Sequence, residues 1–170
     1  MGIVFDLLTT PILGPIRGVH WLATKVAEVA ESELLDEGKV RRELLDLTGN
    51  PLAPDKLQQG DLLVMKVTLE TDNPAVANIV VEDLLPAGLE IENANLKTSQ
   101  AVSWCKDKQT LQLLHTDIRD DRMVAFTDRF SGKQTYFYAV RAVTPGEFVM
   151  PAILATCMYD PGIRSVNGAG

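Results

Sequence analysis

The residue types that could carry out chemistry are few in this chain, and the first to consider are a histidine, an acid and two serines. His115 and Asp117 follow Ser99 and Ser103 in the sequence, and these are the side chains from which a hydrolytic triad is built. No nucleophile-elbow motif accompanies them. The segment also has strand character, so that successive side chains point to opposite faces. We therefore expect no catalytic triad.

Acidic residues gather around the same segment and resemble a calcium-binding loop at first sight. The ligand spacing of such a loop is absent, and arginines lie between the acids. The cluster comprises Asp117, Asp120, Asp121 and Asp128, with Arg119, Arg122 and Arg129 among them. This mixture predicts a salt-bridged turn. Because His20 has no second ligand at metal spacing and no glycine-rich phosphate loop occurs, we expect no metal, no cofactor and no enzyme.

The composition limits the location and the partners. A net charge of −7 disfavours nucleic acid and anionic membranes, because both require a concentrated basic face. No apolar run reaches the roughly 18 residues of a membrane span. The N-terminus lacks a basic region and is interrupted by Pro11 and Pro15, which is atypical of a secretory signal, so we expect a cytoplasmic chain. Cys105 and Cys157 could pair only if the fold brings them close, and two free thiols are the simpler interpretation.

Residues 1–47 are predicted to form a helical segment after a short apolar opening and a kinked connector that contains Pro11 and Pro15. From Ile16 to Leu35 apolar residues recur every three or four positions and form one stripe, which we expect to need a covering surface. The stripe consists of Val19, Leu22, Val26 and Val29. Trp21 is either an interface anchor or, more simply, a packing residue beside Pro15. After Gly38 the segment "KVRRELLDL" predicts a second short helix. The candidates to cover the stripe are the second half of the chain, another copy, or a foreign assembly.

This segment resembles the beginning of gas vesicle protein G. The stretch "LLTTPILGPIRGVHWLATKVAEVAESELLDEGKVRRELLDL" has the apolar start, the proline-containing connector and the helix end of that family. The matching positions are Leu7, Leu8, Pro11, Pro15, Gly18, Trp21, Ala23, Ala30, Glu33, Leu34 and Asp36. The resemblance implies an accessory role in gas vesicle assembly, with gas vesicle proteins as partners. The further acidic helix of that family is missing here.

A different pattern begins at Thr48. Gly49, Asn50 and Pro51 form a turn cluster, after which Leu63, Met65, Val67 and Leu69 alternate with polar residues such as Lys66, Thr68 and Glu70. Similar alternation recurs in "ANIVVEDLLP", "RMVAFTDRF", "QTYFYAVRAV" and "EFVMPAILATCMY". The segment "SWCKDKQTLQLLHTDIRDD" predicts a hairpin around Lys106 to Lys108, followed by a turn at Asp120 and Asp121. Seven or so short strands predict a mainly β fold, an antiparallel β-sandwich with an N-terminal helical appendage.

The second segment resembles the C-terminal macroglobulin domain of bacterial alpha-2-macroglobulins, a sandwich of macroglobulin or fibronectin-III type. The resemblance is carried, in order, by "GNPLAPDKLQQGDLLVMKVTLE", "VVEDLLPAGLEIENANL", "DIRDDRMVAFTDRF", "YFYAVRAVTPGEFVMP" and "MYDPGIRS". Members of that family trap endopeptidases in the bacterial envelope. The resemblance implies that this domain packs on a thioester domain and shields its Cys–Gln bond, through Met158, Tyr159 and Asp160.

The sequence therefore predicts two modules of unrelated ancestry, a chimera of residues 1–47 and 48–170. The leading function is that of a non-catalytic interaction domain of an endopeptidase inhibitor. It is incomplete as an inhibitor, because neither Cys105 nor Cys157 has a glutamine three residues on. The alternative is a gas vesicle assembly protein that acts through its N-terminal helices. We also expect loose docking of these helices on the sandwich, or self-association through them.

Overall fold

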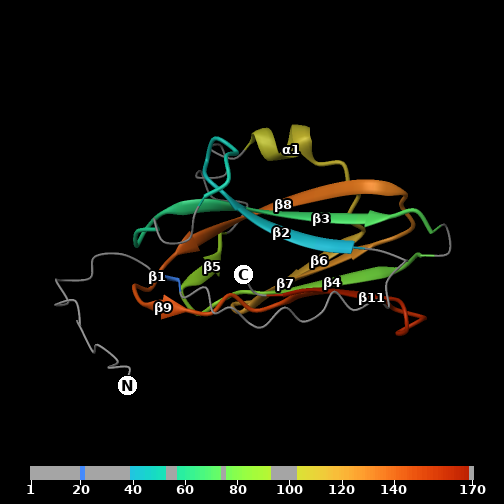
Figure 1. The fold of residues 1–170 in the computed structure, drawn as a ribbon. Helices are drawn as coiled ribbons and strands as arrows, with labels where there is room; N and C mark the ends of the chain where they lie inside the picture. The colour runs from blue at the N-terminus through green and yellow to red at the C-terminus, as the bar shows by residue number, and fades with distance from the viewer. Residues whose placement is uncertain (1–19, 22–38, 53–56, 74–75, 93–102, 169–170) are drawn as a thin grey trace, which may run out of the picture.

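The computed structural model describes residues 20–21, 39–52, 57–73, 76–92 and 103–168. Two antiparallel sheets face each other in these residues and form the two layers seen in Figure 1. The predicted mainly β, antiparallel architecture is confirmed. The predicted helical appendage falls almost entirely on residues outside the described ranges, and so do Val19, Leu22, Val26 and Val29.

The upper layer is a four-stranded sheet in the order β2-β3-β8-β5. Its strands are β2 (Lys39–Leu45), β3 (Leu62–Thr71), β5 (Leu89–Ile91) and β8 (Gly132–Ala142). The lower layer has the order β11-β10-β4-β7-β6. Its strands are β4 (Ile79–Leu84), β6 (His115–Ile118), β7 (Arg122–Thr127), β10 (Ile153–Cys157) and β11 (Arg164–Asn167).

The core lies between these layers and follows the alternation of the strands. In β3 the predicted inward residues Leu63, Met65, Val67 and Leu69 are all buried. Thr68 was expected on the solvent side but is buried as well. β3 pairs with β2 on one side and β8 on the other, so neighbouring side chains enclose its outer face too.

The predicted second helix is wrong, because Lys39 to Leu45 form strand β2. All seven of its residues pair with β3, from Lys39 opposite Glu70 to Leu45 opposite Val64. The arginine, glutamate and leucine residues favour a helix locally, but residues 40, 42 and 44 also alternate with exposed neighbours, a period of two. Pairing with a central strand therefore overrides the helical propensity. This strand lies on the N-terminal side of the predicted boundary at Thr48.

Trp21 also departs from the helical prediction. His20–Trp21 form the short strand β1, which pairs in parallel with β9 (Glu147–Phe148). The backbone at these two positions therefore pairs with another strand, and the rest of the predicted helix, residues 16–19 and 22–35, lies outside the described residues. Figure 1 shows β1 and β9 together at the left end of the molecule.

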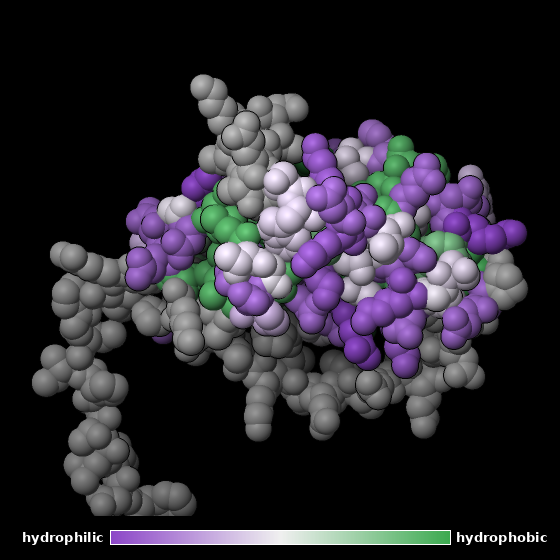
Figure 2. Space-filling model, turned by 90° about the horizontal axis from the view of Figure 1, so that it is seen from above, coloured by the Kyte–Doolittle hydropathy of each residue, from purple (hydrophilic) through white to green (hydrophobic). Residues whose placement is uncertain are grey.

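The predicted hairpin around Lys106 to Lys108 is also wrong, because these residues belong to the short helix α1 (Trp104–Lys108). The indole N–H of Trp104 donates to the Leu47 carbonyl at 2.8 Å, and its ring meets Phe137 edge-on at 5.6 Å. These contacts fix α1 on the outer face of the four-stranded sheet (Figure 1). Hydrophilic side chains spread over the middle of that face, as Figure 2 shows.

Candidate interaction site

The residues that the family resemblance singled out form the turn between β10 and β11. Met158 and Tyr159 follow β10 directly, and their side chains are 51% and 80% exposed. The turn lies at the right end of Figure 1, opposite β1 and β9. Two large apolar or aromatic side chains therefore project from one tight connection into solvent, an arrangement that suits contact with another protein.

Hydrogen bonds hold the backbone of this turn. The Ile163 N–H donates to the Asp160 carbonyl at 2.9 Å, and the Gly162 N–H donates to the Asp160 side chain at 3.1 Å. At the start of the turn, the Met158 N–H donates to the carbonyl of Asn78 at 2.9 Å. Asp160 thus acts within the turn, while Tyr159 has no hydrogen bond to any described residue. Hydrogen bonds therefore hold the backbone of the turn, and the side chain of Tyr159 projects into solvent.

An apolar pocket opens beside the turn, at the end of the two sheets. Its lining includes Leu69, Val76, Ile79, Phe130 and Ile163. Cys157 also borders it, and its thiol donates to the carbonyl of Ala77 at 3.0 Å. Leu69, Val76, Ile79 and Cys157 are themselves buried, so the pocket belongs to the core of the sandwich.

The two cysteines are free, as the simpler interpretation predicted. Cys105 lies on α1 and Cys157 at the end of β10, on opposite layers of the sandwich. Burial raises the pKa of the Cys105 thiol to about 11, so this thiol is a poor nucleophile near neutral pH.

The residues considered for a triad do not form one. His115 and Asp117 lie on β6, at one edge of the five-stranded sheet, whereas Ser103 precedes α1 on the other layer. Ser99 lies outside the described residues. The ring of His115 instead tilts against that of Phe126, with 5.7 Å between the centroids.

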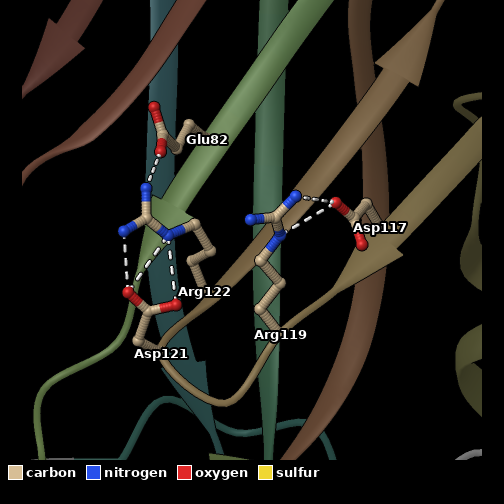
Figure 3. A network of polar contacts seen from close by, with 5 residues as sticks. All are labelled: Glu82, Asp117, Arg119, Asp121 and Arg122. Atoms are coloured by element: carbon tan, nitrogen blue, oxygen red, sulfur yellow. Dashed lines mark hydrogen bonds and ion pairs between the residues drawn. The ribbon is translucent and has the colours of Figure 1, made fainter.

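Part of the acidic cluster forms the predicted salt-bridged turn, shown in Figure 3, whereas Asp120, Asp128 and Arg129 form no ion pair with a described residue. Arg119 pairs with Asp117 at 2.9 Å, and Arg122 pairs with Asp121 at 2.7 Å. Hydrogen bonds from Arg122 lower the pKa of Asp121. Arg122 also reaches Glu82 on β4, a partner that lies 40 residues away and that sequence spacing did not reveal. Within the described ranges, no group of three or more His, Cys, Asp or Glu residues is arranged to hold a metal ion.

A second polar group, which sequence reasoning missed, lies inside the sandwich. Arg42 on β2 forms an ion pair with Asp83 on β4, and their side chains are 7% and 0% exposed. The Tyr138 hydroxyl donates to the other oxygen of Asp83 at 2.5 Å, and Arg42 also donates to the carbonyls of Leu84 and Pro151. The ion pair joins the two layers and makes β2 an integral part of the core.

Burial and the neighbouring charges act in opposite directions on Asp83. Desolvation raises the pKa of its carboxyl above 3.8, while the Arg42 guanidinium and the Tyr138 hydroxyl lower it. Burial also raises the pKa of Tyr138 well above 10, which keeps its hydroxyl a hydrogen-bond donor to the carboxylate. The site is therefore a structural network within the core, distant from the exposed turn.

The two facing antiparallel sheets, joined by a buried ion pair, define an antiparallel β-sandwich. Comparison with protein families identifies the kind of sandwich, since the family described as the bacterial alpha-2-macroglobulin MG10 domain matches residues 39–162. The chain belongs to this family. The match begins at the first residue of β2, so the strand that was predicted as a helix lies within the family's domain.

Individual relatives agree with the family match. The chain is 35% identical over 146 residues to alpha-2-macroglobulin of Xylella fastidiosa strain Temecula1, covering 81% of this chain and 9% of that protein. It is 33% identical to alpha-2-macroglobulin of Escherichia coli K12, over 77% of this chain and 8% of the relative. The structure of Escherichia coli alpha-2-macroglobulin activated by porcine elastase superposes with a TM-score of 0.73 at 32% identity, covering 80% and 13% of the two chains. The chain thus spans less than a tenth of these two curated relatives.

A second family, gas vesicle protein G, matches residues 8–50. Most of this match lies outside the described residues. Its last part overlaps the MG10 match over residues 39–50, and there the structure shows strand β2 and the turn that follows it. Among the described residues, no helix is long and apolar enough to cross a membrane.

Proposed function

We propose that this chain is a non-catalytic interaction domain that binds a thioester-type domain through the turn formed by Met158, Tyr159 and Asp160. The 80% exposure of Tyr159, on a turn fixed by hydrogen bonds, is the observation that carries the proposal. An aromatic side chain that projects from an ordered backbone loses little conformational entropy on binding.

The proposal predicts a large loss of affinity when the ring of Tyr159 is removed. Tyr159→Ala in the full chain should weaken binding to the isolated thioester domain of Escherichia coli alpha-2-macroglobulin at least about 30-fold, the effect of losing about 2 kcal/mol at an interface anchor. Binding would be measured by isothermal titration calorimetry. The melting temperature should not change, because Tyr159 makes no hydrogen bond to the described residues.

A matched control distinguishes this turn from apolar surface in general. Leu114 is 62% exposed and directly precedes β6, at the sheet edge opposite β11. Leu114→Ala should leave the affinity within about twofold of the unmodified chain. Equal binding by the Tyr159→Ala and Leu114→Ala variants would refute the role of the turn.

The domain alone is expected to lack inhibitory activity. Since neither cysteine has a glutamine three residues on, the chain has no residues for an internal Cys–Gln thioester. Incubation with trypsin should give no covalent adduct on a denaturing gel and no loss of activity toward a large protein substrate. A covalent complex would contradict the proposed division of roles between this domain and the thioester domain.

The family match over residues 8–50 favours a second candidate function, in which the N-terminal segment binds gas vesicle proteins. Co-expression of the full chain with gas vesicle proteins, followed by affinity purification, tests this candidate. Co-purification that is unaffected by Tyr159→Ala would assign a separate function to the N-terminal segment. Absence of co-purification would leave the sandwich as the functional part.

A further inference from the structure

The base of the β10–β11 turn is attached to the residues that precede β4. The thiol of Cys157 donates to the carbonyl of Ala77 at 3.0 Å, and the N–H of Met158 donates to the carbonyl of Asn78 at 2.9 Å. Both acceptors lie 80 positions before their donors in the sequence. Two neighbouring backbone carbonyls therefore hold the two residues that come directly before Tyr159.

Asn78 has a backbone conformation that few residues adopt. Its φ is 52°, and within the described ranges it is the only residue other than glycine with a positive φ. This left-handed region costs an L-residue free energy, because the Cβ approaches the following carbonyl oxygen. Asparagine is enriched in this region, whereas a β-branched residue there is an outlier. The contacts around Asn78 therefore have to maintain its conformation.

The side chain of Asn78 does not account for this conformation. The residue is exposed, and its side chain forms no hydrogen bond with a described residue. The core fixes the chain on both sides instead, since Val76 and Ile79 are buried in the same hydrophobic cluster. Ile79 also lies opposite Cys157 in the last pair of the β4–β10 ladder. What Asn78 contributes to the turn is thus its backbone.

The left-handed residue also changes how this ladder ends. Continuing the register by one residue places Asn78 opposite Met158. A hydrogen-bonded antiparallel pair normally exchanges two bonds. In the described residues this pair has one, from the Met158 N–H to the Asn78 carbonyl. The next contact then joins the Ala77 carbonyl to the Cys157 thiol, in place of a backbone N–H.

We propose that Asn78 is a positioning residue for the turn formed by Met158, Tyr159 and Asp160. Its left-handed backbone keeps the carbonyls of residues 77 and 78 directed at the base of the turn, and this sets the direction in which Tyr159 projects. The other hydrogen bonds of the turn, among residues 157–163, close it on itself. The inference rests on the proposed function, because a fixed direction of Tyr159 matters for binding.

Backbone ¹⁵N relaxation of the full chain, measured without a partner, tests the positioning. In Asn78→Val the order parameter of the Tyr159 amide should fall from about 0.85, typical of a rigid backbone, to below about 0.6. The reason is that valine avoids the left-handed region, so the acceptor carbonyls leave the turn. Asn78→Gly should keep the value near about 0.85, since glycine adopts a positive φ without strain. The amide of Val67, in the middle of β3, should stay rigid in both variants.

Affinity for the isolated thioester domain of Escherichia coli alpha-2-macroglobulin, measured by calorimetry, relates the positioning to binding. Asn78→Val should weaken binding about tenfold, because the turn then has to be ordered on association. Asn78→Gly should bind within about twofold of the unmodified chain. Asp120→Val is the matched control, since it places the same side chain at an exposed turn position without a positive φ. It should change neither the order parameter of Tyr159 nor the affinity.

The outcomes distinguish this inference from the proposed function. An unchanged order parameter at Tyr159 in Asn78→Val would overturn the positioning role, whatever the affinity. A flexible turn with full affinity would overturn it as well. Full affinity of the Tyr159→Ala variant would instead overturn the proposed function, and the order parameters would still decide whether Asn78 holds the turn. If Asn78→Val does not fold, Asn78→Ala gives the same test with less strain, because alanine has no β-branch.

Discussion

Replacing Arg42 by methionine should strongly destabilise the sandwich, because it leaves a buried carboxylate without its cation. Methionine keeps much of the volume of the arginine stem, so the main change is the loss of charge and of the donors to Leu84 and Pro151. Asp83, which is fully buried, would retain the Tyr138 hydroxyl as its donor. Breaking a buried ion pair from one side typically costs about 3–5 kcal/mol.

Urea unfolding of the full chain at pH 7, followed by circular dichroism, measures this loss. The free energy of unfolding of a small domain falls by about 2 kcal/mol per molar urea. A loss of about 4 kcal/mol therefore lowers the urea concentration at the unfolding midpoint by about 2 M. This is a large part of the total stability of an ordinary domain, about 5–15 kcal/mol. Replacing both partners, Arg42→Met with Asp83→Leu, should recover much of the loss, because no buried charge then lacks a partner.

The pH dependence of the stability lost in the Arg42→Met variant shows whether the unpaired Asp83 carboxylate is its cause. Burial raises the pKa of Asp83, and the loss of Arg42 removes the largest factor that lowers it, so the pKa rises further in the variant. A carboxyl whose folded pKa lies above its unfolded value contributes stability below the unfolded pKa, and this contribution is lost as pH rises through the folded pKa. The penalty of Arg42→Met should therefore be smaller at pH 4 than at pH 7.

The control lies on the next residue of the same strand. Glu43 pairs with Lys66 at the surface, where the two side chains are 49% and 29% exposed. Glu43→Gln should cost less than about 1 kcal/mol at pH 7, as exposed ion pairs do. An Arg42→Met penalty equal to that of Glu43→Gln, without dependence on pH, would refute the account of the buried pair.

Three further changes have defined outcomes. Gly88→Ala should cost about 1–3 kcal/mol in urea unfolding, because a Cβ there would lie 2.5 Å from the ring of Phe148. Deleting residues 39–47 together with all that precede them should abolish cooperative thermal unfolding, since the sandwich loses an edge strand and its buried cation. Thr48→Ala should raise the pKa of Asp46 from about 2 toward 3.8 in a carboxyl NMR titration, because the Thr48 hydroxyl bond is the largest factor that lowers it.

Each of these changes has a control or a contradicting result. Gly168→Ala meets no atom within 4 Å and should leave the unfolding midpoint in place. A cooperative melt from the chain that begins at Thr48 would show that β2 is dispensable, and the chain that begins at Lys39 is its control. In the Thr48→Ala variant, an unchanged Asp46 titration would assign the low pKa to the backbone donors instead. The depressed pKa also means that the contribution of Asp46 to stability is present above about pH 4 and is lost as the pH falls toward 2.

The alternation of apolar and polar residues along the sequence predicted the strands most reliably. In β3 the predicted inward residues Leu63, Met65, Val67 and Leu69 occupy every second position, and each of them is buried, although Val64 and Thr68 on the other face are buried too. The same period predicted β4 and β7, and the acid–arginine mixture at Asp120 and Asp121 predicted the turn between β6 and β7. Strand order could not be predicted, because pairs such as β4 with β10 join residues that are distant in sequence.

The errors have a common physical cause. In β2 good helix-forming residues coincide with a two-residue period, and only the neighbouring strand β3 decides between the two structures. Nothing in the local sequence indicated that Arg42 is buried, because its partner Asp83 lies 41 residues away. At Trp104 an aromatic contact with Phe137 on another strand stabilises a short helix within a segment of strand-like pattern. Local sequence carries no signal for contacts of this kind.

The location of the binding surface is the most direct test of the proposed function. Amide chemical-shift mapping of the isotopically labelled full chain, titrated with the Escherichia coli thioester domain, should give the largest changes at Met158, Tyr159 and Asp160. The amides of α1, on the outer face of the other sheet, should not shift. Changes centred on α1 or on β6, with none at the turn, would contradict the proposal that this sandwich binds through the β10–β11 turn.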